Sequence, residues 1–122
     1  DLRMKHQNGR VKLNMGSAHR RAVIRNQAIS LIDNGHLVTT KARAQEVRRF
    51  VEKMVTIARS GNNFNNRRKI ESLMPYKKES IEKLFVDIAP KYVQRPGGYT
   101  RIIPMGRRIS DTATIARLEW VA

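Results

Sequence analysis

The stretch TKARAQEVRRFVEKMVTIARSG, residues 40–61, decides the fold that the sequence predicts. Its apolar residues recur every three or four positions, so they fall on one face of an α-helix. Thr40 suits the cap at the start, and Ser60-Gly61 suits the end. We therefore expect this helix to form the centre of the core. Its apolar face would consist of Ala44, Val47, Val51, Met54, Val55 and Ala58.

Two elements are predicted on the N-terminal side of this helix. Ser17 is a typical N-cap, and the residues after it have helical periodicity up to residues 33–35, where Gly35 suits the left-handed position that follows a helix. Residues 36–40 are rich in β-branched side chains and follow a turn, which predicts a brief strand. The apolar face of the first helix would consist of Ile24, Ala28, Leu31 and Ile32.

Two further helices are predicted on the C-terminal side. Residues 62–66 form a polar stretch around a phenylalanine and indicate a loop, and residues 67–74 predict a short helix that Pro75 ends. A last helix is expected over residues 79–89, closed by Pro90. Its apolar face would consist of Ile81, Leu84, Phe85 and Ile88.

After this helix the period changes from 3.6 to 2, which is typical of strands. Residues 95–98 predict a turn, 99–104 a strand, 105–112 a connecting loop and 113–121 a second strand. One face of that second strand would carry Ala116, Leu118 and Trp120, with Trp120 in the core. The order is thus helix, strand, three helices, two strands. It predicts an α+β fold in two layers, with a small sheet covered on one side by helices.

Charge indicates the partner. The chain has 25 Lys and Arg against 10 Asp and Glu in 122 residues, a net charge of +15. Between Asp1 and Asp33 there is no acidic residue at all. The positive charges of such a segment repel one another until a dense polyanion neutralises them. Nucleic acid is the polyanion that binds it most favourably, because each phosphate contact releases counterions. We expect residues 1–16 to be a basic, extended arm and residues 17–122 to be one α+β domain that binds the nucleic acid.

The sequence gives little support to an enzyme. His6, His19 and His36 have no metal-ligand spacing and no nearby carboxylate cluster, so neither a metal site nor acid–base catalysis is predicted. The chain has no cysteine, which excludes disulfides and thiolate sites. No apolar run approaches the roughly 20 residues of a membrane span. We expect no cofactor, no small-molecule substrate and no membrane partner.

Cations at predicted helix starts are the clearest candidates for phosphate contacts. Near the positive end of a helix dipole each cation costs about 0.3–1 kcal/mol, which a bound phosphate would reverse. Arg20 and Arg21 follow Ser17 in this way, and Lys41 and Arg43 follow Thr40. The alternatives are a solvated basic helix end at the first place and an ordinary capped helix entrance at the second.

Three other groups of residues have a functional and a structural interpretation. Arg48 and Arg49 lie off the apolar stripe of the central helix, facing either RNA or solvent. The segment 67–69 is expected to open a helix with cations for the third time. Residues 97–101, Gly-Gly-Tyr-Thr-Arg, could approach RNA closely and stack Tyr99 on it, or could simply enter a hairpin with Tyr99 half in the core.

A series of short motifs runs along the chain in this order: Leu13-Asn14, Ser17-Ala18-His19-Arg20, Arg25-Asn26, His36, Thr39-Thr40-Lys41-Ala42-Arg43-Ala44, Gly97-Gly98-Tyr99-Thr100-Arg101-Ile102 and Leu118-Glu119-Trp120-Val121. In order and spacing the series resembles the bacterial-type family of large ribosomal subunit protein seventeen. This resemblance covers nearly the whole chain. It implies a structural, non-catalytic protein of the large subunit. The partners would be the long ribosomal RNA near the nascent-chain exit and neighbouring ribosomal proteins, in a cytoplasmic or organellar ribosome.

Charge, position and resemblance together select the candidate RNA-binding residues. They are Arg3, Lys5, His6, Arg10, Lys12, Asn14, Ser17, His19, Arg20, Arg21, Arg25, Asn26, Thr40, Lys41, Arg43, Arg48, Arg49, Arg67, Arg68, Gly97, Gly98, Tyr99, Arg101, Arg107 and Arg108. The rival hypothesis is a DNA-binding architectural protein, which would place one helix in the major groove. Dispersed charge suits a large, irregular RNA surface better.

Overall fold

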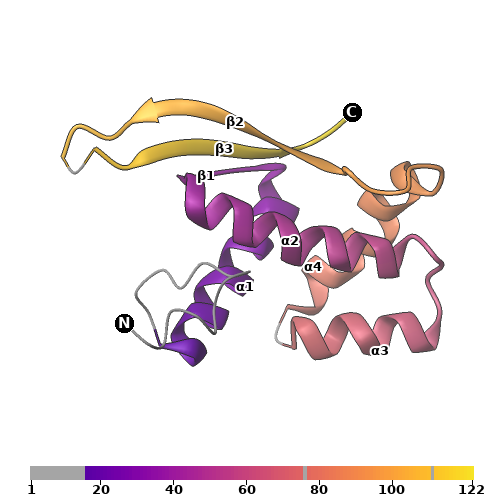
Figure 1. Ribbon diagram of the computed structural model, residues 1–122. Helices are drawn as coiled ribbons and strands as arrows, with labels where there is room; N and C mark the ends of the chain where they lie inside the picture. Colours follow the sequence, from indigo (N-terminus) through magenta and orange to yellow (C-terminus); the bar gives the residue numbers. More distant parts are fainter. Residues whose placement is uncertain (1–15, 76, 111) are drawn as a thin grey trace, which may run out of the picture.

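The helices and strands follow the order that the sequence predicts (Figure 1). The computed structural model describes residues 16–75, 77–110 and 112–122. The elements are α1 (Ser17–Asn34), β1 (His36–Thr40), α2 (Lys41–Ala58), α3 (Phe64–Leu73), α4 (Lys78–Lys83), the π-helical turn η2 (Leu84–Ile88), the 3₁₀ turn η3 (Ala89–Tyr92), β2 (Thr100–Arg107) and β3 (Thr114–Trp120). The α+β class is confirmed.

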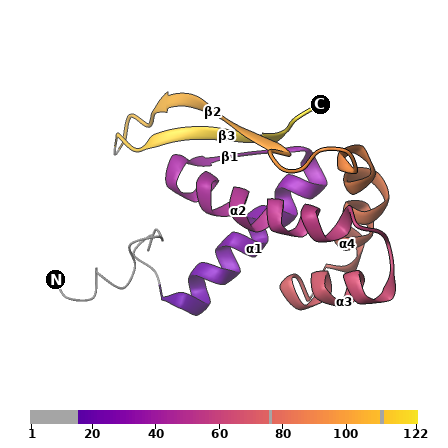
Figure 2. The same cartoon turned by 45° about the vertical axis from the view of Figure 1, so that its right-hand side comes forward.

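The sheet has three antiparallel strands in the order β1-β3-β2. Leu118 of the middle strand pairs with Leu37 of β1 on one side and with Ile102 of β2 on the other. Figures 1 and 2 both show α2 beneath this sheet and α3 on the far side of α2, while α1 runs from below α2 up to β1. The sheet is therefore covered by helices on one side, as expected.

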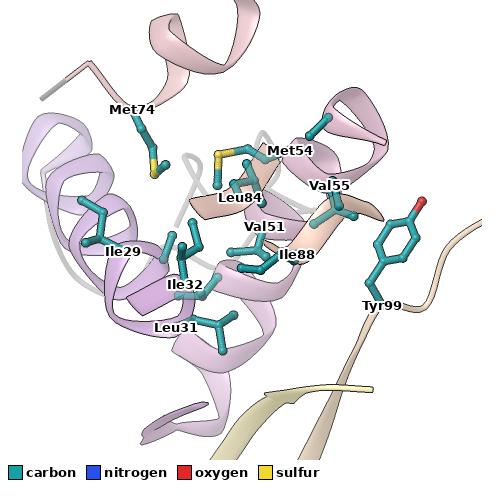
Figure 3. Packing of buried hydrophobic residues seen from close by; sticks show 14 of the residues in the cluster. Ile29, Leu31, Ile32, Val51, Met54, Val55, Met74, Leu84, Ile88 and Tyr99 are labelled. Carbon is teal, nitrogen blue, oxygen red and sulfur yellow. The ribbon is translucent and has the colours of Figure 1, made fainter. Parts of the chain in front are cut away.

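The core lies between α2 and the elements packed around it (Figure 3). Every residue of the predicted apolar face of α2 is at most 3% exposed, and Leu31, Leu84 and Leu118 are fully buried. Trp120 packs against this core, and its indole N–H donates to the Leu31 carbonyl at 3.3 Å. The predicted central role of α2 is confirmed, and Trp120, which was expected in the core, is partly buried against it.

Two predicted helix boundaries are confirmed by their backbone geometry. Gly35 adopts φ 86°, and its N–H donates to the Leu31 carbonyl, which closes α1. At the start of α2 the Thr40 hydroxyl accepts a hydrogen bond from the Arg43 N–H at 3.4 Å. These caps fix the short connection of α1 through β1 to α2.

Two predicted helix starts are wrong. Ser17 is the first residue of α1 and not its cap, because Gly16 has the extended cap conformation and its carbonyl accepts from the Arg20 N–H at 2.8 Å. The expected loop over residues 62–66 is shorter, since the Asn63 side chain accepts from the Asn66 N–H at 2.9 Å and starts α3 at Phe64.

Two predicted ends are also wrong. Pro90 does not close the last helix, because the chain passes through the π-helical turn into a 3₁₀ turn, where proline occupies an early position that needs no N–H donor. The strand expected to end at residue 104 continues to Arg107 through an irregularity after Pro104. Gly106 allows this with φ 91°, so the connection after β2 begins at Arg108 and not at residue 105 as expected.

Candidate nucleic-acid interface

A groove of about 460 Å³ lies between α1 and α2, beside the end of α3. On α1 its residues are spaced for one side of the helix, and on α2 they recur at i, i+3, i+4 and i+7, which is again one helical face. Packing of the two helices brings these faces together. The groove is lined by Arg20, Arg21, Ile24 and Arg25 of α1, by Glu46, Arg49, Phe50 and Lys53 of α2, and by Leu73 of α3.

The charge of the groove is strongly positive. It has five cationic side chains and a single carboxylate, that of Glu46, which pairs with Arg49 at 2.7 Å. The other lining residues are apolar: Ile24 is buried, and Phe50 and Leu73 are half-buried against the core. The groove is suited to an anion that also carries an apolar part.

The start of α1 adds to this positive field. No side chain caps it and no acidic residue lies in its first turn, so the helix dipole is not compensated locally by the described residues. Ser17 and His19 are exposed beside Arg21, and Arg20 is partly buried. The hydroxyl of Ser17 therefore does not serve as the cap, and whether it contacts RNA stays a prediction.

At the start of α2 the predicted cap is confirmed, because the Thr40 hydroxyl accepts a hydrogen bond from the Arg43 N–H. Whether Lys41 and Arg43 also bind phosphate there stays a prediction. Lys41 is exposed there, and Arg43 is partly buried. A second hollow of about 490 Å³ joins this helix start to the start of β3, with Thr40, Lys41 and Thr114 among its lining residues. No acidic residue lies in the first turn of α2 either.

Arg48 and Arg49 point to different partners on α2. Arg49 pairs with Glu46 and lines the groove. Arg48 donates to Glu52 at 3.4 Å, and Glu52 in turn holds Thr100 at the start of β2. Both guanidinium groups are substantially exposed. Only Arg49 therefore belongs with the α1 cations in one site.

Arg67 and Arg68 do not open α3, which begins one turn earlier, so the expected third helix start with cations is wrong. Arg67 pairs with Glu82 at 2.7 Å and lies over the Phe85 ring at 5.2 Å. It thus joins α3 to α4 and η2. Arg68 is exposed and lies over the Phe64 ring.

Tyr99 is in the core, so the expectation that its ring stacks on RNA is wrong. It is 1% exposed, its ring lies 5.2 Å from that of Tyr92, and its hydroxyl is 3.1 Å from the Thr56 hydroxyl. Gly97 and Gly98 have φ values of 144° and 65°, with open space where a Cβ would lie. Their role in the structure is to permit the hairpin entrance.

The remaining candidates are spread over the surface. Arg101 is exposed on β2 and paired with Glu119, and Arg107 and Arg108 are exposed near the hairpin end. Asn26 is exposed on α1. The arm candidates Arg3, Lys5, His6, Arg10, Lys12 and Asn14 lie outside the described residues.

Sequence reasoning missed five lining residues of the groove, which are Ile24, Glu46, Phe50, Lys53 and Leu73. A signal was present, since Glu46, Arg49, Phe50 and Lys53 form a second helical face beside the apolar stripe of α2. The pairing of that face with α1 and Leu73 comes from tertiary packing, which no local pattern indicates.

None of the helices in the described part of the chain has the length and apolar character that crossing a membrane requires. Within the same part of the chain, no three His, Cys, Asp or Glu side chains gather as a metal would need.

The fold and this surface define a class: a small, strongly basic α+β protein whose helices present clustered cations at its surface. Comparison with known proteins places it further, because the family model described as "Ribosomal protein L17" matches residues 23–121. The chain belongs to this family. It is a structural constituent of the large ribosomal subunit and not an enzyme, which confirms the resemblance noted in the sequence and the expected location in the ribosome.

Individual relatives agree over almost the whole chain. The protein named "Large ribosomal subunit protein bL17" of Sulfurimonas denitrificans is 45% identical over 97% of this chain and 100% of its own length. Those of Helicobacter acinonychis and Sphingopyxis alaskensis are 43% and 46% identical over the same share of this chain, and over 100% and 84% of their own lengths. Membership of a ribosomal family decides against the DNA-binding architectural alternative.

Proposed function

We propose that this chain binds and stabilises the ribosomal RNA of the large subunit during assembly and translation. The observation that carries the proposal is the groove between α1 and α2, where five cations face one carboxylate. A surface of this charge is costly unless a polyanion covers it. The ribosome supplies that polyanion, since the chain is one of its constituents.

The mechanism is neutralisation and positioning. Arg guanidinium groups bind phosphate through two parallel hydrogen bonds, which fixes orientation as well as charge. Arg20, Arg21 and Arg25 lie on one wall of the groove and Arg49 and Lys53 on the other, so phosphates from two RNA segments can be held against one rigid pair of helices. This would stabilise a fold of the RNA without any chemical step.

The body and the arm have separate roles in this proposal. Residues 17–122 form the domain that docks on the RNA, and residues 1–16 form a basic arm that adds contacts beyond it. Surfaces away from the groove would contact neighbouring ribosomal proteins. Arg67, which pairs with Glu82 and lies over the Phe85 ring, holds the fold together, and we assign it no leading part in RNA binding.

A gel-shift titration tests this proposal. The full chain is mixed with large-subunit ribosomal RNA, or with duplex DNA of equal length, over a range of salt concentrations. If five to eight cations contact phosphate, log K falls with log salt at a slope of roughly −3.5 to −7. The RNA should also be preferred over the duplex. RNA binding with a slope near zero, or a preference for duplex DNA, would contradict the proposal.

A further inference from the structure

We infer that the groove between α1 and α2 binds one unstacked nucleotide of RNA, with the base against its apolar floor and the flanking phosphates at its cationic rim. This inference rests on the proposed RNA-binding function and adds the form of the ligand. A site for phosphates alone would need only the cations. The apolar floor made by Ile24, Phe50 and Leu73 indicates that the ligand also has an apolar part.

The floor suits a base. Phe50 is half-buried, so its ring packs on the core and still lines the groove. Leu73 lines it from α3 and Ile24 from α1. Aromatic side chains bind unstacked bases irrespective of sequence, because every base has a π face. The volume of about 460 Å³ lies within the range of pockets that enclose small organic groups.

The positive charge of the rim favours some ligands over others. Arg21 and Arg25 of α1 face Arg49 and Lys53 of α2 across the groove. This arrangement repels a second copy of the chain, which carries a net charge of +15. The bases of a duplex cannot contact the floor of the groove, because they are stacked inside the double helix. Irregular RNA offers both the extruded base and a phosphate on each side of it.

Short RNA chains provide the direct test. A fluorescein-labelled hexauridylate is compared with an abasic ribose-phosphate chain of the same length and charge, using fluorescence anisotropy and the full-length protein. We expect the base-bearing chain to bind about tenfold more tightly, which is the typical effect of one stacked base. Equal affinity for the two chains would overturn the inference, because it would show that the groove recognises charge alone.

Matched variants locate the effect. Phe50→Leu keeps an apolar side chain and should remove most of the tenfold preference. Phe64→Leu makes the same change at a ring that is 72% exposed on α3, outside the groove, and should leave the preference intact. Thermal melts confirm that both variants fold. The same loss of preference in both variants, or no loss in Phe50→Leu, would overturn the inference.

Crosslinking tests it without any substitution. Hexamers containing 4-thiouridine are irradiated with the unmodified protein, which is then digested with trypsin and analysed by mass spectrometry. Cleavage after Arg49 and Lys53 isolates Phe50 in its own short peptide, and cleavage after Lys69 and Lys77 isolates Leu73. We expect crosslinks in these two peptides. Crosslinks confined to the peptide that contains Phe64, or to the hairpin, would contradict the inference.

The outcomes also separate this inference from the proposed function. If the full chain binds neither ribosomal RNA nor the oligonucleotides, the proposed function fails and the inference fails with it. If ribosomal RNA is bound in a salt-dependent way but the base-bearing and abasic chains bind equally, only the inference fails. The groove would then be an anion surface that an acidic protein segment could also occupy.

Discussion

Glu52 on α2 and Thr100 at the start of β2 are joined by two hydrogen bonds, because the Thr100 N–H and hydroxyl both donate to Glu52 Oε2, at 3.1 and 2.9 Å. Thr100 is 2% exposed, so its backbone N–H has little access to water. Arg48 donates to the same oxygen at 3.4 Å. This carboxylate thus fixes the entrance of the β2–β3 hairpin to the central helix.

Replacing Glu52 with Ala should lower the free energy of unfolding by about 1–3 kcal/mol, since a buried donor is left without a partner. Urea unfolding measures the change. Glu82→Ala is the control, because its pair with Arg67 is more exposed and should contribute about 1 kcal/mol or less. Equal losses in the two variants would show that the contact between Glu52 and Thr100 has no special structural role.

Tyr99→Phe should lower the free energy of unfolding by about 1 kcal/mol, because it removes the hydrogen bond between the Tyr99 and Thr56 hydroxyls. Its affinity for ribosomal RNA should stay within about twofold of the parent, since the ring is buried. Chemical unfolding and anisotropy titrations check the two parts. A large loss of RNA affinity at unchanged stability would contradict the prediction, because it would show that Tyr99 contacts the RNA.

The ion cluster on the sheet predicts a dependence on pH. Hydrogen bonds from Arg101 and Arg117, both at 2.7 Å, hold the pKa of the Glu119 carboxyl below its usual 4.5. The ionised carboxylate therefore stabilises the folded state above that usual pKa, and the contribution is lost as the pH falls through the lower, folded-state pKa. Glu119→Gln should be less stable than the parent at pH 7.

The difference between the two proteins should shrink toward zero as the solution is acidified below the folded-state pKa. Urea midpoints from pH 7 to pH 2 measure it. A difference that stays constant or widens on acidification would show that the charge of Glu119 is not what stabilises the folded state.

The central helix could be predicted from the sequence because its apolar spacing and its tertiary role agree. The errors occurred at element ends, where a few local contacts decide. The cap at Asn63 places the start of α3 before the cations that we expected at its first turn. Pro90 lies in a 3₁₀ turn, although we expected it to end the helix. The positive φ of Gly106 allows β2 to continue beyond the residue where we expected a loop to begin. Such choices depend on tertiary packing as much as on propensity.

For the candidate site, the sequence indicated the cations of α1 and α2 but not the groove. The groove requires Phe50 and Leu73 to meet Ile24, and these residues come from three helices. Likewise, nothing local links Glu52 to Thr100, 48 positions apart. Sequence patterns place residues on the faces of elements, whereas a site arises when the elements pack.

Deleting residues 1–15 should separate stability from binding. The deletion removes no residue of the described core cluster, so the melting temperature should be nearly unchanged. It removes four of the 25 Lys and Arg residues, and the slope of log K against log salt should become shallower by roughly 0.7–0.9 for each phosphate that the shortened chain no longer binds. Incorporation into large subunits should weaken. A large drop in melting temperature would show that the arm is part of the core.

The central claim is that the cations of the groove bind ribosomal RNA, and charge reversal on α1 tests it most directly. Arg20→Glu, Arg21→Glu and Arg25→Glu are combined in one variant, with Lys77→Glu, Lys78→Glu and Lys91→Glu as a control of equal net charge outside the groove. Acidic residues near the start of α1 complement the helix dipole, so the free domain should be unchanged or slightly more stable.

The decisive measurement is the affinity of the two triple variants for large-subunit ribosomal RNA at near-physiological salt. We predict that the α1 variant loses roughly 100-fold or more, because three charged hydrogen bonds become three repulsions, and that the control loses far less. An α1 variant that is folded and binds as tightly as the parent, or no more weakly than the control, would contradict the account.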